Sequence, residues 1–341
     1  MQEQLRSGMN FEKACPAKEN PMSLKSILAV YSGNAGDSGG LRLAIHMARK
    51  YDAHLTGVVW HGPSPLEHRF RRYMSREIRD AISAQDDEIV SQARAAFTAR
   101  VAKEGLAQRS NFIEIRGRAD FSLATCARGY DIAVIGNRVS AMGREHFAAR
   151  PDVVALRSGR PVVVAPPSLD LAQIGTRALV AWDGKRSAAR ALGDALHILS
   201  TKEHVTVLSV DEAPAAGPGD DLVTLLGRHG IPAEQVVRPA GPGGIAHTIL
   251  DACAEAKAGL LIMGAYEHSK FAEDLLGGDL VPLEHQLGGV DALVAHLVDL
   301  AGHGDALTDL AEAGLLLHQE RRHVLVDRVG ALVGLDQPCP A

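Results

Sequence analysis

Residues 26–60 read SILAVYSGNAGDSGGLRLAIHMARKYDAHLTGVVW, and residues 177–210 read RALVAWDGKRSAARALGDALHILSTKEHVTVLSV. Both stretches begin and end with a continuous apolar run, which is typical of a strand covered on both faces. Between those runs both carry apolar residues at helical spacing, such as Leu41, Ile45 and Ala48 in the first stretch. Each stretch therefore predicts a strand, a turn, a helix and a second strand, and the chain contains this pattern twice.

The two copies also match further along the chain. Residues 112–115 and 235–237 are short candidate strands, and residues 131–136 correspond to residues 260–264. Strands that alternate with helices imply right-handed crossovers and a parallel sheet. We therefore expect an α/β protein with two Rossmann-like domains in tandem, each a doubly wound, five-stranded parallel sheet.

The pattern divides the chain into four parts. We expect residues 1–22 to be a disordered extension, residues 23–168 the first domain and residues 176–280 the second domain. Residues 281–341 form an atypical tail, so the second domain is expected to be truncated at its last strand. The first domain has an extra helical segment that should pack on its own sheet through one apolar stripe, made of Ile78, Ile82, Ile89, Ala93, Phe97 and Val101.

The tail differs in composition from the rest of the chain. Residues 280–341 contain no Phe, Tyr, Trp, Ile, Met, Lys, Asn or Ser. Every residue there except Thr308 and Cys339 can be encoded by a codon that begins with G or C. We therefore hypothesise that the reading frame shifts near Gly278. The alternative is a genuine helical appendage, since leucines recur at helix-like spacing in this region.

The overall composition excludes several classes of protein. A net charge of -5 and a pI near 6.3 give no general attraction to nucleic acid or to anionic membranes. No run of about 18 apolar residues occurs, so no membrane-spanning helix is expected. The four cysteines have neither metal-site spacing nor a disulfide framework. We expect a cytoplasmic protein that binds neither nucleic acid nor membrane. Arginines around Phe70 and Tyr73 leave open a phosphate-binding or RNA-binding surface, a solvated face or a dimer edge.

Residues 260–278, LLIMGAYEHSKFAEDLLGG, carry the strongest functional signal. An apolar strand ends at Gly264, and a glycine pair, Gly277 and Gly278, would expose backbone amides that suit a phosphate. In an open parallel sheet, ligands bind beyond the carboxyl ends of the strands where the winding direction reverses. That rule also selects Asp183, which ends the first strand of the second copy. The alternative interpretation is that Asp183 only caps the following helix.

The two copies and this glycine-bounded segment resemble a tandem universal stress protein. The resemblance implies that the second domain binds ATP or another adenine nucleotide, with Mg²⁺ alongside it and no other metal. It assigns Asp183 to the base or ribose, Val210 and Met263 to adenine, and Gly264, Gly277 and Gly278 to phosphate. Ala181, Glu267 and His268 are the other expected site residues. Glu267 stands where nucleotide-binding members of this family have a glycine.

The resemblance leads to three functional hypotheses. The first is a stress-response binding module that is not an enzyme. The second is a nucleotide-independent scaffold, which Glu267 favours, and the third is a slow ATP hydrolase. The first copy has no Asp at the tip of its first strand, so it is expected to be structural, with the loop from Gly33 to Gly40 as a flexible turn and helix cap. The two copies are expected to pack as an internal pseudo-dimer, and a homodimer is an alternative.

Overall fold

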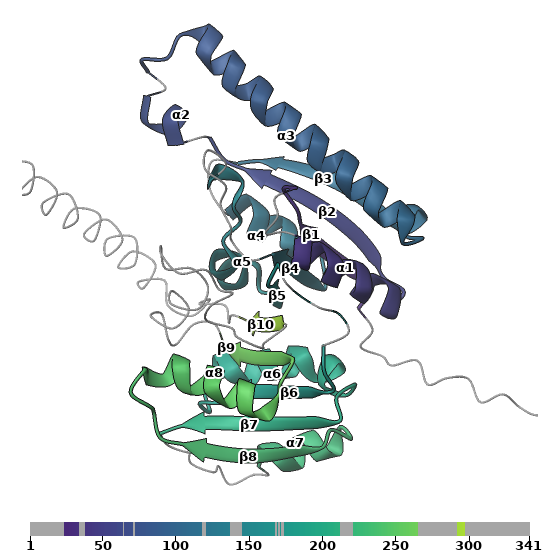
Figure 1. Ribbon diagram of the computed structural model, residues 1–341, viewed down its shortest axis with the longest axis vertical. Helices are drawn as coiled ribbons and strands as arrows, with labels where there is room; N and C mark the ends of the chain where they lie inside the picture. Colours follow the sequence, from purple (N-terminus) through teal and green to yellow (C-terminus); the bar gives the residue numbers. More distant parts are fainter. Residues whose placement is uncertain are drawn as a thin grey trace, which may run out of the picture. The chain divides into compact units, whose positions relative to one another are not determined.

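A computed structural model describes most of the two repeats (Figure 1). The described residues are 24–33, 38–63, 65–70, 72–117, 121–136, 145–167, 169, 171, 174–211, 221–264 and 292–296. The chain divides into two compact units, residues 1–298 and 299–341, and every described residue belongs to the first. The expected N-terminal extension, the segment 265–278 and the tail, except for residues 292–296, lie outside the described residues.

The first repeat forms a parallel sheet in the order β3-β2-β1-β4-β5. Its strands are β1 (Ser26–Val30), β2 (His54–His61), β3 (Ser110–Arg116), β4 (Ile132–Gly136) and β5 (Val162–Ala165). Its helices are α1 (Ser38–Lys50), α2 (Pro65–Phe70), α3 (Arg76–Lys103), α4 (Phe121–Ala127) and α5 (Pro151–Ser158), with the 3-10 turns η2 (Ala107–Arg109) and η3 (Glu145–Phe147). The expected doubly wound, five-stranded domain is confirmed.

The second repeat has the same winding, in the order β9-β6-β7-β8. Its elements are β6 (Arg177–Ala181), α6 (Arg186–Leu199), β7 (His204–Val210), α7 (Leu222–Arg228), β8 (Ala233–Arg238), α8 (Gly244–Ala256) and β9 (Leu260–Gly264). A further strand, β10 (Ala292–His296), pairs parallel with β9 and antiparallel with β5. The position of the last strand is therefore filled by residues of the tail, and the frameshift hypothesis stays a prediction.

Alternate residues of each central strand face opposite helical layers. In β6, Val180 belongs to the same buried cluster as Leu192 of α6, whereas Leu179 belongs to the cluster that contains Ile249 and Cys253 of α8. This arrangement explains why the strands are continuously apolar, because both faces are covered. Burial raises the pKa of the Cys253 thiol to about 12, so this cysteine acts as a small apolar core residue.

Helix α3 runs beside β3 (Figure 1), but the expected apolar stripe is buried along only part of its length. Ile89, Ala93, Phe97 and Val101 are at most 6% exposed. Ile78 near the N-terminal end is 51% exposed, so the prediction that the whole stripe packs on the sheet is wrong there. Ile78 lies in the first turn of this 28-residue helix, whereas the buried residues of the stripe begin at Ile89.

The C-terminal ends of α1 and α6 meet. The ring of Tyr51 lies edge-on to the ring of His197, with centroids 6.0 Å apart, and Lys50 Nζ lies 3.4 Å from Thr201 Oγ1. His197 is 8% exposed, and its Nε2 atom has no hydrogen-bond partner among the described residues. Burial is the main cause of the lowered pKa of His197, and the positive charge of Lys50 lowers it further. Asp194 and Asp131 raise this pKa, but they do not outweigh burial.

We expect this histidine to make the protein less stable in acid. Because its pKa is lowered in the folded state, the unfolded chain binds more protons, and stability decreases as the pH falls below the unfolded value of about 6.5. His197→Gln should reduce the difference between the unfolding free energies measured by urea titration at pH 7.5 and pH 5.5. His229→Gln is the control, because His229 is exposed and should leave that difference unchanged. An unchanged pH dependence in His197→Gln would contradict the assignment.

Candidate functional site

The carboxyl ends of β6 and β9 meet where the winding direction of the second sheet reverses. The two strands pair in parallel, with Val180 opposite Ile262, while β7 and β8 lie on the other side of β6. The loop after β6 and the end of β9 are thereby brought to one edge. The sequence-based expectation that the first and fourth strands of this repeat are neighbours is confirmed, and ligand binding between them stays a prediction.

Asp183 lies in a tight turn after β6. Trp182 is held by two hydrogen bonds to β7: its N–H donates to Leu208 O at 2.8 Å, and its carbonyl accepts from Ser209 Oγ at 2.9 Å. Asp183 Oδ1 accepts from the backbone N–H of Lys185 at 3.0 Å. Lys185 is the N-cap residue of α6 and makes no side-chain capping bond itself. Asp183 therefore braces the turn that leads into α6, and the alternative interpretation, that it only caps the helix, stays a prediction.

Gly264 packs directly against the start of α6. A Cβ atom at this position would lie 2.7 Å from Ala188 N and 2.7 Å from Ser187 Oγ. Real Cβ atoms do not come this close to backbone atoms, so glycine is required for β9 and α6 to meet. This close packing is a reason for Gly264 that the sequence motif did not reveal, and it is independent of any phosphate.

The remaining expected site residues fall into two groups. Met263 is 4% exposed, and Ala181 and Val210 are partly buried against the same apolar cluster. Four others lie outside the described residues, namely Glu267, His268, Gly277 and Gly278. The structure therefore places the expected residues on β6, β7 and β9, and it does not describe the segment expected to hold phosphate.

Asp211 is a residue of this edge that sequence reasoning missed. It follows β7 with a positive φ of 68°, and its Oδ1 accepts from Ala240 N–H at 2.7 Å. A left-handed conformation is uncommon for any residue except glycine, although Asp tolerates it better than most. The contact joins the ends of β7 and β8. The sequence does contain a signal for this residue, because Asp211 directly follows a buried strand, as Asp183 nearly does.

In the first repeat, Trp60 occupies the position equivalent to Val210. The strand registers pair Val30 with Val58 and Ala181 with Leu208, so Trp60 and Val210 each lie two residues further along. Trp60 is 7% exposed and donates from Nε1 to Ser122 Oγ at 2.9 Å. Trp60 is thus a buried, hydrogen-bonded residue at the strand position where the resemblance puts an adenine contact in the second repeat.

The glycine loop of the first repeat is only partly a flexible turn. Residues 34–37 lie outside the described residues, whereas Gly39 and Gly40 belong to α1. A Cβ atom on Gly40 would lie 2.6 Å from Gly136 N, and one on Gly39 would lie 1.8 Å from Pro166 O. The expectation that these glycines form a loop is wrong, because they allow α1 to approach the ends of β4 and β5.

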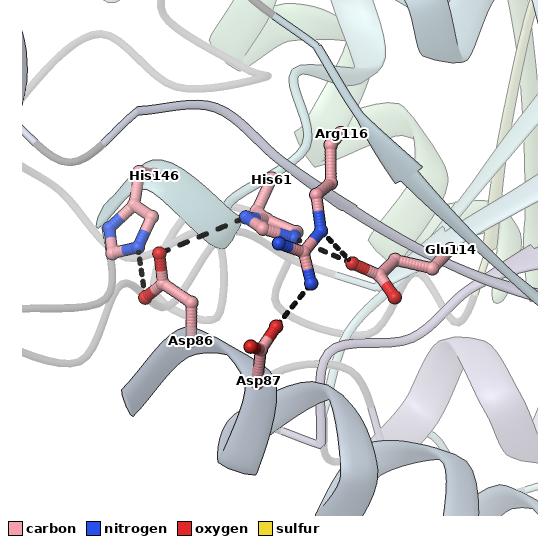
Figure 2. A network of polar contacts seen from close by, with 6 residues as sticks. All are labelled: His61, Asp86, Asp87, Glu114, Arg116 and His146. Atoms are coloured by element: carbon pink, nitrogen blue, oxygen red, sulfur yellow. Dashed lines mark hydrogen bonds and ion pairs between the residues drawn. The ribbon is translucent and has the colours of Figure 1, made fainter. Parts of the chain in front are cut away.

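A buried polar network lies at the carboxyl edge of the first sheet (Figure 2). His146 Nε2 lies 3.0 Å from Asp86 Oδ1, and His61 Nε2 lies 3.2 Å from Glu114 Oε1. His61 Nδ1 faces Asp86 Oδ2 at 4.0 Å, and the His61 ring stacks on Phe147 with centroids 4.8 Å apart. The side chains of His61 and His146 are each 6% exposed. The network therefore ties α3 and η3 to the end of β2.

Arg116 extends the network toward solvent. It pairs with Glu114 and with Asp87, which is on α3 beside Asp86 (Figure 2). Burial alone would raise the pKa of Glu114, but hydrogen bonds with Arg116 and His61 outweigh it, and the pKa is lowered. Sequence reasoning missed this network because its members come from separate segments and form no motif. No group of three or more His, Cys, Asp or Glu in the described parts of the chain could hold a metal ion.

The fold has known counterparts among solved structures. A universal stress protein from Archaeoglobus fulgidus DSM 4304 matches with a TM-score of 0.58 and 14% identity, over 82% of this chain and 98% of that one. A functionally unknown protein from Pseudomonas aeruginosa PAO1 matches with a TM-score of 0.47 and 15% identity, over 82% and 94%. No family description matches the sequence, and no curated protein does.

The first of these likenesses defines the fold as that of a universal stress protein. At 14% identity it concerns the fold alone. Among the described helices, none combines the length and the apolar character needed to cross a bilayer.

Proposed function

We propose that this chain is a tandem universal stress protein whose second repeat binds an adenine nucleotide, ATP in the first instance. The observation that carries the proposal is that Asp183 and Gly264 each contact the start of α6, where the winding of the sheet reverses. The protein would act in the cytoplasm as a stress-response module that changes its partners on binding, without turnover chemistry.

Three features of the described residues fit a nucleotide. Asp183 supplies a carboxylate at the tip of β6, which can accept hydrogen bonds from a ribose or an adenine amine. Gly264 brings the tip of β9 against the start of α6, close to the turn that holds Asp183. The N-terminus of α6 has no side-chain cap from Lys185, and helix N-termini favour anions. A bound nucleotide would supply its own Mg²⁺ ligands through its phosphates.

The test is calorimetric titration of the full chain with ATP and Mg²⁺. Asp183→Asn is the informative variant, because its amide oxygen can still accept from Lys185 N–H while the negative charge is lost. Losing a hydrogen bond to a charged group should weaken ATP binding by about tenfold to a hundredfold. Asp251→Asn, on the exposed face of α8, is the matched control and should bind ATP as the unchanged protein does.

Two results would count against this proposal. If Asp183→Asn and Asp251→Asn bound ATP with equal affinity, the nucleotide site would not be at the end of β6. If millimolar ATP produced no heat of binding, the protein would not bind this nucleotide. A thermal melting curve of Asp183→Asn without ligand shows whether the turn after β6 is still intact. An unchanged curve would mean that only the affinity for ATP was lost. Release of inorganic phosphate during the titration would instead favour the slow ATP hydrolase.

A scaffold without nucleotide is the second candidate. Phe70 and Tyr73 are 46% and 86% exposed, and Ile78 nearby is also exposed, among several arginines. Exposed aromatic and arginine side chains are enriched in protein interfaces. This surface on the α2–α3 segment favours a partner-binding role, which would persist if ATP does not bind.

A further inference from the structure

A cleft lies between the C-terminal ends of α1 and α6. Its enclosed volume is about 70 Å³, within a wider hollow of about 510 Å³ that includes open solvent. Its floor is apolar, because Leu43, Met47, Val163 and Leu260 line it and are at most 6% exposed. Val163 and Leu260 lie near the amino ends of β5 and β9, so the cleft is at the opposite edge of the sheet from Asp183.

The rim of the cleft is polar and basic. His46, Lys50 and Lys202 line it together with Tyr51 and Thr201, and none of the described lining residues is an Asp or a Glu. Lys50 Nζ lies 3.4 Å from Thr201 Oγ1 and 5.4 Å from the centre of the Tyr51 ring. Within the described chain, no carboxylate forms an ion pair with Lys50. The cleft thus combines an apolar floor with an ammonium group whose charge is not balanced by an acid.

The charged neighbours that act on His46 are positive. Burial lowers the pKa of His46, and the positive charges of Lys50 and Arg49 lower it further. Burial also lowers the pKa of Lys50. Lys50 and His46 are exposed residues at the edge of the buried apolar floor, so an anion could reach Lys50 from solvent while its apolar body contacts the cleft.

The carbonyl groups at the end of α6 also lie near the cleft. The C-terminus of a helix carries about half a negative charge, which arises from carbonyl groups without partners. At the end of α6 the carbonyl of Ile198 accepts from Thr201 N and Thr201 Oγ1, and the carbonyl of Leu199 accepts from Lys202 N. These carbonyls of α6 are therefore already hydrogen-bonded within the end of the helix.

We propose that this cleft binds a small carboxylate with an apolar body. The hydrocarbon or aromatic body would cover Leu43, Met47 and Leu260, and the carboxylate would lie between Lys50 and His46. The cleft is built by both repeats, so a bound carboxylate would stabilise their contact. This inference does not rest on the nucleotide site.

Calorimetric titration of the full chain with octanoate tests the proposal. Octan-1-ol and octylammonium are the comparison ligands, because they have the same hydrocarbon chain as octanoate but a neutral or a positive head group. Octanoate should bind about tenfold more tightly than octanol, and octylammonium should bind least. Lys50→Met keeps the apolar stem and should weaken octanoate by about tenfold. Arg49→Met is the matched control, because Arg49 pairs with Glu104 at 3.0 Å and does not line the cleft.

A second readout reports where the carboxylate lies. A bound anion favours protonated His46, so octanoate should raise the pKa of His46 in an NMR titration, and its affinity should be higher at pH 6 than at pH 8. ATP should not compete with it. The proposal is overturned if octanol binds as tightly as octanoate, if Lys50→Met and Arg49→Met behave alike, or if His46 does not respond.

Discussion

Replacing Asp86 by alanine is expected to destabilise the protein by about 3 kcal/mol, because two buried imidazoles lose the carboxylate they share. The Asp86 side chain is 12% exposed, and it faces His146 at 3.0 Å and His61 at 4.0 Å. His146 Nδ1 already has no partner in the described structure, so the loss would leave the whole ring without a hydrogen bond. Urea unfolding followed by circular dichroism measures the change.

The next residue provides the control. Asp87 is also an aspartate of α3, but its side chain is 54% exposed and it pairs with Arg116, which is equally accessible to water. Surface ion pairs contribute about 0–1 kcal/mol, so Asp87→Ala should have a small effect. Similar losses in both variants would mean that the network has no special role. A loss below about 1 kcal/mol in Asp86→Ala would show that α3 is held by its apolar residues alone.

Gly264→Ala is expected to cost about 2–3 kcal/mol, because one extra methyl group meets the backbone at the start of α6. The new Cβ would lie 2.7 Å from Ala188 N, and the contacted atom belongs to a helix that is packed on the sheet. The strand end or the helix must move to relieve the contact. The free energy of unfolding from urea titration would show this cost in the absence of any nucleotide.

Gly193→Ala is the same chemical change, but we expect it to have the opposite effect on the stability of the protein. Gly193 is inside α6, and a Cβ atom there would meet nothing within 4 Å. Alanine in a helix interior is more stable than glycine by about 0.5–1 kcal/mol, so this variant should be stabilised. If Gly264→Ala were as stable as the unchanged protein, the start of α6 would be able to yield. A glycine variant is in any case a poor probe of phosphate binding here.

The sequence by itself determined the architecture. The repeat of apolar strands and helix-spaced residues in residues 26–60 and 177–210 was sufficient to predict two doubly wound parallel sheets. Burial on both faces leaves a strand few polar positions, and the resulting pattern is local enough to read without coordinates. The same pattern placed Asp183 and Gly264 at the edge where the winding reverses.

Only the tertiary structure decided what individual polar and small residues contact. His61, Asp86 and His146 come from three distant segments, and nothing in their local sequence signals that they share one buried network. The reason for Gly264 is likewise the position of α6, which the strand sequence does not contain. Strand and helix formation depends on nearby residues, whereas burial and pairing depend on which elements the fold brings together.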